Sequence, residues 1–475
     1  MTPGFRRAAL VGSTAILALG LIACNGAARA DSDQSASLTR TQAIAEVNDL
    51  VAGLQSAHPN LYFREQKAEL DARVQTVESR FTESIRVTDL YRAVEPVVTS
   101  IGDAHTSIDP YLPDYIRYRD AGGRLFPLEL RFYGSYGVVI ANYGPEYSIP
   151  LGAHVLGIDG KAVTTLLDEL GKYESGENSA LKQQFIANDL RVLMWIDGMN
   201  PPYRVEFASP PSAILTTTLQ GATVTDIHRW DSSPTGVQQE GDCNLRLFEG
   251  GQVAVLASHS FQADSECRSS FGGVFKRLRH SQTKSLIIDI RENTGGDTRV
   301  ADALMNYITA RPYRDFSEIS MRSSAFVKRR LGRNNYVEIY GTEAWGAPDG
   351  QIVHLSIDYS DPEPELDRFH GRVYILTGPG TYSTAVVFAA AAQDAHAATI
   401  VGQETAGSPT FYGEAFPFEL PRSGLNVTVS TKYFIGPSGI RSTRGVIPSI
   451  SLQASPQAGN DTELTAAIQI ATSGR

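Results

Sequence analysis

One stretch, residues 371–393, joins an apolar strand, a tight turn and an apolar helix around a single serine. It reads GRVYILTGPGTYSTAVVFAAAAQ, and the helix is expected from about Thr384. Ser383 at this junction can hold its hydroxyl at the edge of a sheet. The amides of the helix's first turn have no intrahelical partner and carry partial positive charge, so the arrangement suits a nucleophile beside an oxyanion site. A second interpretation stays open, in which Thr381 or Ser383 only caps the helix.

The composition excludes several classes of function. Of 475 residues, 42% are hydrophobic and 20% charged, which is typical of a globular protein of two or three domains. The net charge of −10 argues against a nucleic-acid partner and a polybasic membrane patch. The sequence has no HExxH or CxxC, its nine histidines are scattered, and no Walker or Rossmann glycine pattern follows a strand. We therefore expect neither a dedicated metal site nor a cofactor.

Residues 1–30 predict export. Two arginines precede an apolar run, 8–23, that is too short for a comfortable membrane span. The run ends in Leu-Ile-Ala-Cys and resembles a bacterial lipobox, in which Cys24 would carry a diacylglycerol anchor. Ordinary cleavage after the Ala-Arg-Ala at 28–30 is the alternative. The chain is expected to be an outer-membrane lipoprotein that faces the periplasm or the cell surface, and otherwise periplasmic or secreted.

Export also permits disulfides. Beyond Cys24 the chain has two cysteines, Cys243 and Cys267. We predict that they pair, which would contribute about 3 kcal/mol by the chain-entropy estimate. Two separate buried thiols are the alternative.

Three domains follow the leader, as changes of pattern indicate. The predicted boundaries are a helical cap at 38–110, a β-rich domain at 120–230 and an α/β core at 240–455, after a signal segment and tether at 1–30. Helical periodicity predicts cap helices at about 39–54, 65–81 and 84–101. In the core, an apolar strand, a helix and a second apolar strand at 285–290 predict a parallel pair. Residues 311–370 are predicted to be irregular.

Two further motifs carry polar side chains that could do chemistry. The strand at 285–290 runs into the motif Asp-Ile-Arg-Glu-Asn-Thr-Gly-Gly, which spans 289–296 and ends in Gly295 and Gly296. This motif could bind a ligand or form only a structural ion pair. His105 lies in a Gly-Asp-Ala-His-Thr turn at the end of the cap. It could serve as a general base or be a capping or surface histidine.

Four blocks occur together in one order: Gly-Asp-Ala-His-Thr at 102–106, Asp-Ile-Arg-Glu-Asn-Thr-Gly-Gly at 289–296, Thr-Tyr-Ser-Thr-Ala at 381–385, and Gly-Gln-Glu-Thr-Ala-Gly at 402–407. Together they resemble the tail-specific protease, or C-terminal processing peptidase, family. The nearest branch is the one with tricorn protease and the interphotoreceptor retinoid-binding proteins, which lacks the Ser-Lys dyad. The resemblance implies an α/β fold with a crotonase-like core, a PDZ-like β-rich domain and an N-terminal helical cap.

The resemblance also implies roles for individual residues. Ser383 would be the nucleophile and His105 the general base, with backbone amides of Thr384 and of Gly295 or Gly296 as oxyanion donors. The better-known branch has a lysine twenty-five residues after its serine, where this chain has Ser408. Lys432 is a weak substitute.

The third member of a triad departs from the branch's pattern. Where its glutamate should stand, before Gly-Val-Ile-Pro, this chain has Ser442. Glu404 or Asp103 would then orient the histidine.

The function expected from these residues is an exported serine-type endopeptidase, a hydrolase that cleaves peptide or protein substrates through an acyl-enzyme on Ser383. We expect the protein to contact a membrane through the lipid anchor alone. The alternative is a weakly catalytic or non-catalytic protein that binds an apolar ligand or a peptide on the same scaffold. The oligomeric state is not indicated by the sequence.

Overall fold

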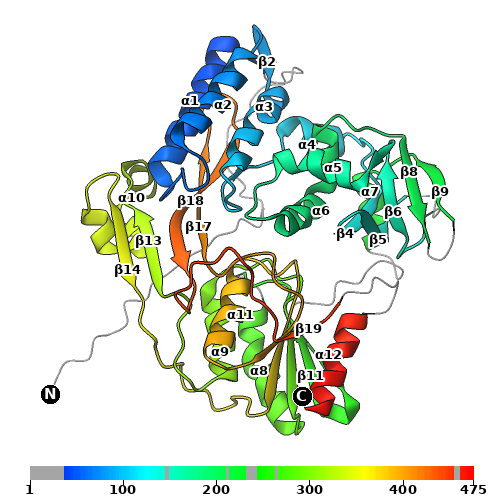
Figure 1. Cartoon of the computed structure of the whole chain (residues 1–475), viewed down its shortest axis with the longest axis vertical. Coiled ribbons are helices and arrows are strands. Elements are labelled where there is room, and N and C mark those ends of the chain that lie inside the picture. Colours follow the sequence, from blue (N-terminus) through cyan, green and yellow to red (C-terminus); the bar gives the residue numbers. More distant parts are fainter. Residues whose placement is uncertain are drawn as a thin grey trace.

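The computed structural model describes residues 37–144, 149–209, 213–231, 243–262, 266–453 and 461–474. It shows a helical cap, a β-rich domain and an α/β core (Figure 1). The predicted leader and its lipidation site, Cys24, lie outside the described residues. Within them, no helix has both the length and the apolarity needed to cross a bilayer.

The cap consists of α1 (Arg40–Ala57), α2 (Lys67–Ser79) and α3 (Val87–Ser100), with a small ladder between β1 (Ser37–Thr39) and β2 (Ser84–Arg86). The three helices agree with the prediction. A capping box starts α1, because the Thr39 hydroxyl accepts from the Gln42 amide and the Gln42 side chain accepts from the Thr39 amide. After the cap, β3 (Ser107–Ile108) and α4 (Pro113–Asp120) lead onward.

The β-rich domain is an antiparallel sheet in the order β4-β5-β6-β8-β9. Its elements are β4 (Leu128–Tyr133), β5 (Tyr136–Asn142), β6 (His154–Ile158), β7 (Lys161–Ala162), α5 (Val163–Leu170), η1 (Gly171–Tyr173), α6 (Ser179–Ile196), β8 (Tyr203–Ala208), β9 (Leu215–Leu219) and α7 (Val224–Asp231). Helix α6 extends from this domain toward the core and the end of the cap (Figure 1).

The core is a six-stranded sheet in the order β10-β11-β12-β15-β16-β19, parallel except for β10. Its strands are β10 (Asn244–Phe248), β11 (Val253–Ala257), β12 (Ser285–Asp289), β15 (Arg372–Thr377), β16 (Thr399–Gly402) and β19 (Ile450–Ser451). One face packs under α8 (Glu266–His280), α9 (Thr298–Ile308) and α11 (Thr384–Asp394), and the other under α12 (Thr462–Ser473). The predicted parallel pair is β11 with β12. Strands covered on both faces explain the continuous apolar runs.

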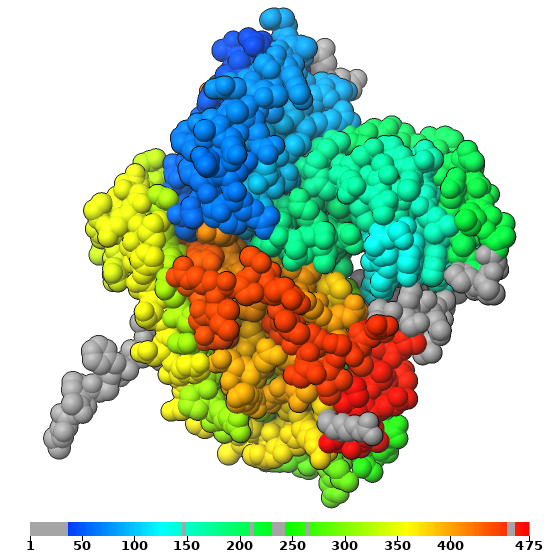
Figure 2. All heavy atoms as spheres, viewed as in Figure 1, coloured from blue at the N-terminus to red at the C-terminus, as the bar shows by residue number. Residues whose placement is uncertain are grey.

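A second sheet, in the order β14-β13-β18-β17, connects the core to the cap. It consists of β13 (Glu318–Arg322), β14 (Ile352–Ser356), β17 (Phe411–Glu419) and β18 (Asn426–Ile435), and β3 adds to β18 with Ile108 opposite Val427. One hydrophobic cluster runs through the cap, the β-rich domain and this sheet. In Figure 2 the blue cap lies directly against the orange strands.

The prediction of an irregular segment at 311–370 was wrong. The segment contains β13, β14 and, between them, α10 (Ala325–Gly346). The helix is interrupted at Gly332 and Gly341, whose φ angles are 71° and 83°. These breaks interrupt the 3.6-residue periodicity on which a helix prediction depends.

Cys243 and Cys267 form a disulfide, with their α-carbons 5.2 Å apart. It joins the residue before β10 to the first turn of α8, so it ties the edge of the core sheet to the layer above it.

Candidate active site

Ser383 lies between β15 and α11 in a backbone conformation that few residues adopt. Its φ is 52° and its ψ is −125°, and its side chain makes no capping bond to the helix. Thr381 does not cap the helix either, because its hydroxyl donates to the Ile290 carbonyl at 2.8 Å and accepts from the Gly378 amide. The capping interpretation therefore fails for both residues. A positive φ at a serine is costly, and it is typical of a nucleophile on a sharp strand-to-helix turn.

The Ser383 hydroxyl faces His105, which comes from a position 278 residues earlier in the chain. The distance from His105 Nε2 to Ser383 Oγ is 3.2 Å. The imidazole packs between the rings of Tyr382 and Phe411, at centroid distances of 4.9 and 5.4 Å. Both residues are nearly inaccessible, since Ser383 is 3% and His105 7% exposed. His105 is therefore neither a surface histidine nor a helix cap.

Burial lowers the pKa of His105 below its usual 6.5, although the negative charge of Asp103 and a hydrogen bond to the backbone of Tyr412 act in the opposite direction. The imidazole is thus neutral near pH 7 and can accept a proton. The Tyr382 hydroxyl lies 2.8 Å from Nδ1 and 3.1 Å from Nε2. A proton on Nδ1 would leave Nε2 free to accept the proton of Ser383.

Asp103 holds the turn that carries His105 but does not bond to its ring. One carboxylate oxygen accepts from the His105 amide at 3.0 Å, and the other contacts His58 Nε2 at 3.2 Å and the Thr106 hydroxyl at 2.5 Å. Burial raises the pKa of Asp103, but the hydrogen bond and charge of His58 outweigh it, so the pKa is lowered overall. Asp103 is therefore an ionised anchor for the turn.

His58 is a site residue whose role the sequence did not show. It is completely buried, and its Nδ1 accepts from the Asn60 amide at 3.1 Å. That bond leaves the proton on Nε2, where it points at Asp103. The residue belongs to the His-Pro-Asn-Leu-Tyr turn that follows α1.

Gly295 lies directly against the serine, whereas Gly296 lies against the backbone of Phe261. A Cβ on Gly295, whose φ is 98°, would come 2.7 Å from Ser383 Cβ and 2.8 Å from the Thr384 amide nitrogen. Glycine is therefore required here by both the backbone and the space. The Gly295 amide donates to Asn293 Oδ1 at 2.8 Å, and the Gly296 carbonyl accepts from the Thr384 hydroxyl at 2.6 Å. Since the Gly295 amide already has an acceptor, Thr384 is the better placed of the predicted oxyanion donors.

The structure does not place Glu404 or Lys432 at the serine. Glu404 pairs with the Arg444 guanidinium at 2.6 and 2.7 Å and accepts from the Gly445 amide. The buried Lys432 ammonium contacts Glu414 and the Ile339 carbonyl, each at 2.9 Å. Both charges thus have other partners, which corrects the prediction that Glu404 orients His105 and removes Lys432 as a substitute base.

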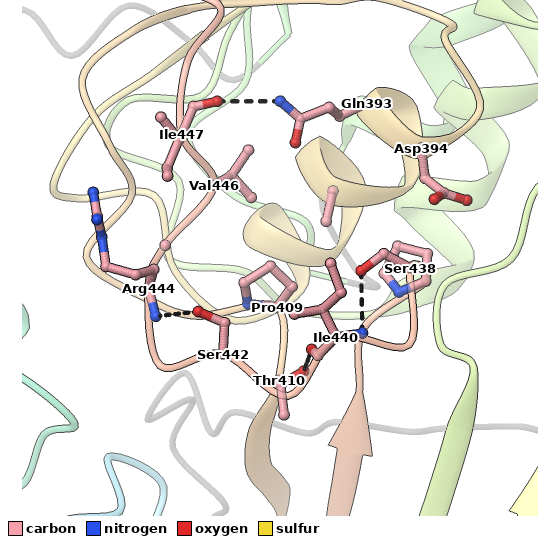
Figure 3. Close-up of a pocket in the computed structure, with 13 residues that line it drawn as sticks. Gln393, Asp394, Pro409, Thr410, Ser438, Ile440, Ser442, Arg444, Val446 and Ile447 are labelled. Carbon is pink, nitrogen blue, oxygen red and sulfur yellow. Dashed lines mark hydrogen bonds between the residues drawn. The ribbon is translucent and has the colours of Figure 1, made fainter.

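Ser408 and Ser442, which stand where related proteins have the lysine and the glutamate, lie side by side. The Ser408 hydroxyl donates to the Ser442 carbonyl at 2.7 Å. Ser442 also lines a cleft of about 430 Å³ between the end of α11 and the loop at 436–447. Figure 3 shows this cleft, with the Gln393 amide bonded to the Ile447 carbonyl across its rim. Neither Ser383 nor His105 lines it.

The first half of the motif at 289–296 is structural. Arg291 bridges Asp289 at the end of β12 and Asp461 before α12, at 2.7 and 2.6 Å. Burial opposes the charge on Arg291, but these carboxylates raise its pKa overall. The ion-pair interpretation therefore holds for Asp289 and Arg291, whereas Asn293, Gly295 and Gly296 contact the segment at 382–384.

A second carboxylate, that of Glu177, lies at the site, and it comes from a segment outside the four sequence blocks. One ligand atom from each of Asp103, His105 and Glu177 lies within 4.8 Å of the others, the one such group found among the described residues. That spacing would suit a metal ion, but the Asp103 oxygens already contact His58, Thr106 and the His105 amide. Sequence spacing gave no signal for Glu177, because it is distant from every block.

Residues 252–452 match the model of peptidase family S41. Over these residues the chain is similar to peptidase family S41. The family is that of the tail-specific proteases, which the four blocks had indicated. In a comparison with curated proteins, the sequence has no significant match.

The likeness of fold to solved structures extends beyond the matched residues. Mature CPAF is similar with a TM-score of 0.65 at 15% identity, covering 88% of this chain and 93% of that one. CPAF complexed with lactacystin gives a TM-score of 0.66 at 15% identity, covering 92% and 97%. The photosystem II D1 C-terminal processing protease gives 0.49 at 16%, covering 90% and 97%. At this identity the CPAF structures establish the α/β fold, including the regions before the core.

Proposed function

We propose that this S41 protein is a serine-type endopeptidase in which Ser383 is the nucleophile and His105 the general base. The observation that carries the proposal is the 3.2 Å contact between His105 Nε2 and the hydroxyl of a serine with positive φ. A neutral, buried imidazole beside a hydroxyl that makes no capping bond to its helix is an arrangement suited to acyl transfer.

The reaction would follow from these positions. Ser383 Oγ attacks the peptide carbonyl while its proton moves to His105 Nε2. Negative charge that develops on the carbonyl oxygen is stabilised at the first turn of α11, where Thr384 supplies an amide. The imidazolium then gives its proton to the leaving amine, and an acyl-enzyme remains on Ser383. A water activated by the same imidazole hydrolyses that ester and restores the serine.

Substrate must displace part of the cover over the site. Leu181 and Phe185 of α6 pack against Tyr382, together with Ala104 and Ala406. The Phe185 ring meets Tyr382 edge-on at a centroid distance of 5.3 Å. Because Ser383 itself is almost inaccessible, we expect binding of an extended peptide to shift α6.

Export belongs to the same proposal. The leader-like residues 1–30 support it, and a disulfide between Cys243 and Cys267 is typical of an oxidising compartment. The substrates would be peptides or proteins outside the cytoplasm, with a lipid on Cys24 as the anchor. An edge of the β-rich domain's sheet could bind an extended peptide as an added strand.

Digestion of an unfolded protein such as reduced casein tests the activity. The wild type should give discrete fragments, and Ser383→Ala should give none at equal protein concentration. His105→Gln should lose several orders of magnitude in rate. Fragments produced at the wild-type rate by Ser383→Ala would contradict the assignment.

Ser442, in place of the branch's glutamate, favours a second candidate function, the binding of an apolar ligand or a peptide on this scaffold. Denaturing mass spectrometry of the purified protein separates the two. A stoichiometric co-purified apolar compound, together with no proteolysis, would support the binding protein.

A further inference from the structure

The segment that leads into α6 is fastened to both halves of the site. The Ser175 hydroxyl donates to the Thr106 carbonyl at 2.6 Å, in the turn that carries His105. The Asn178 side chain donates to the Ala406 carbonyl at 2.7 Å, in the loop after β16. Glu177 lies between these two anchors, so its position is fixed relative to both the cap and the core.

The Glu177 carboxylate points at this turn. Its Oε1 accepts from the Ala104 amide at 3.3 Å. Its Oε2 is buried and has no hydrogen-bond partner among the described residues. A carboxylate oxygen of Glu177 also lies within 4.8 Å of a ring nitrogen of His105. A buried, unpartnered carboxylate oxygen so close to an imidazole is unfavourable unless it meets a positive charge.

Among the other charged and titratable groups around this pair, Arg64 supplies positive charge, but its guanidinium donates to the main-chain carbonyl of Glu177, at 2.6 Å, and not to the carboxylate. The remaining groups are Asp103 and His58 beneath the turn, Tyr382 from the core and Tyr412 from β17. Burial and then the charge of Asp103 raise the pKa of Glu177 to about 7. Near neutral pH Glu177 therefore exists in both forms, and a cation at His105 would favour its ionised form.

We propose that Glu177 is the acid that stabilises the protonated form of His105 during catalysis, in place of the glutamate that the branch with tricorn protease would have at the position of Ser442. The inference rests on the proposed function of Ser383 and His105. Glu177 acts through His105 by charge and does not contact substrate, so it is a positioning residue. Opposite charges within 4 to 6 Å raise the pKa of the basic partner by about 1 to 3 units.

The first test does not need an active enzyme. In a Ser383→Ala background, histidine resonances are titrated by NMR, and the His105 signal is assigned from its loss in His105→Gln. Adding Glu177→Gln should lower the pKa of His105 by about one unit, because the nearby negative charge is removed. Glu174→Gln is the matched control: it lies on the same segment, where burial and the charge of Asp189 raise its pKa. A His105 pKa that does not change in Glu177→Gln would overturn the inference.

The second test is kinetic. Glu177→Gln should reduce kcat/KM by about 10- to 100-fold with a smaller change in KM, and Glu177→Asp should restore part of it. In the wild type, kcat/KM should decline partly as the pH falls through about 7, because Glu177 becomes protonated. This partial decline should be absent in Glu177→Gln. A variant with wild-type kcat/KM and pH profile would refute the role of Glu177 and leave the peptidase intact. An inert wild type would instead refute the peptidase, and the NMR titration would still decide the role of Glu177.

Discussion

At the scale of single residues, the site depends on one contact between two unusual side chains. Ser383 has a positive φ, and His105 is buried where a charged imidazole is disfavoured. Each feature alone would be costly, and together they give a hydroxyl 3.2 Å from an uncharged base. The family's glutamate is absent, so the charge that balances His105 is expected from Glu177.

Gly295→Ala should remove activity without unfolding the protein. The added Cβ would come 2.7 Å from Ser383 Cβ and 2.8 Å from the Thr384 amide nitrogen, where the oxyanion would form. We expect kcat/KM to fall by at least about 100-fold, as on loss of an oxyanion donor. Gly332→Ala is the control, because it also has a positive φ but no atom within 4 Å of the added Cβ. Equal losses in both variants would point to backbone strain instead.

Activity should fall steeply only below pH 6.5. Burial lowers the pKa of His105 below that value, so the base stays neutral and competent until the pH is lower still. The unfolded chain binds this proton more readily than the folded one, so stability should also decline as the pH falls from 6.5 through the lowered pKa. Rates of Ser383 acylation between pH 4.5 and 8 measure the change in activity. Urea midpoints over the same pH range measure the change in stability. A steep loss of activity above pH 7 would contradict the assignment of a neutral His105 as the base.

At the scale of elements, the second sheet and the turn after α1 bring the cap's histidine to the core's serine. Strand β3 pairs with β18 two residues after His105, and the Thr106 hydroxyl accepts from the Ser430 amide at 3.1 Å. Arg322 of β13 donates to the His58 and Pro59 carbonyls at 2.8 and 3.0 Å. The base is thus held by strand pairing and by buried hydrogen bonds.

Arg322→Ala should loosen the cap. It leaves the carbonyls of a completely buried His58 and of Pro59 without their donor, which typically costs about 1–3 kcal/mol. We expect a lower urea midpoint and slower acylation of Ser383. Arg73→Ala is the control, since Arg73 pairs with Glu65 at an exposed position of α2. The explanation fails if Arg73→Ala has the same effect.

The disulfide should stabilise the edge of the core. Cys243 and Cys267 are 24 positions apart, for which the chain-entropy estimate is about 3 kcal/mol. The double variant Cys243→Ser, Cys267→Ser should therefore unfold at a lower urea concentration than the oxidised wild type. Two free thiols in the non-reduced wild type would show that the pair does not form.

Much of the fold and part of the site could be predicted from the sequence. Apolar runs and helical periodicity located the cap helices and the parallel strands, and motif order brought Ser383 and His105 together. Glu404 was misassigned because its partner, Arg444, lies forty residues later. Glu177 and His58 were missed because their roles depend on packing between elements far apart in sequence. The strands β13 and β14 and the helix α10 between them were not predicted, because glycines interrupt the periodicity of α10.

At the scale of the whole molecule, the site is assembled from three regions. His105 comes from the end of the cap, Glu177 from the segment before α6, and Ser383 from the core, and one hydrophobic cluster joins the cap, the β-rich domain and the second sheet. No single region holds both the proposed nucleophile and its proposed base. Reactivity of Ser383 is therefore expected to depend on the folded chain as a whole.

The most direct test is the intact mass of the protein from Asp31 onward, before and after treatment with a fluorophosphonate, beside Ser383→Ala and His105→Ala. The account predicts one adduct on the wild type, none on Ser383→Ala, and reaction slowed by several orders of magnitude on His105→Ala. No adduct on the folded wild type, or one that forms equally fast on His105→Ala, would contradict the claim that His105 activates Ser383.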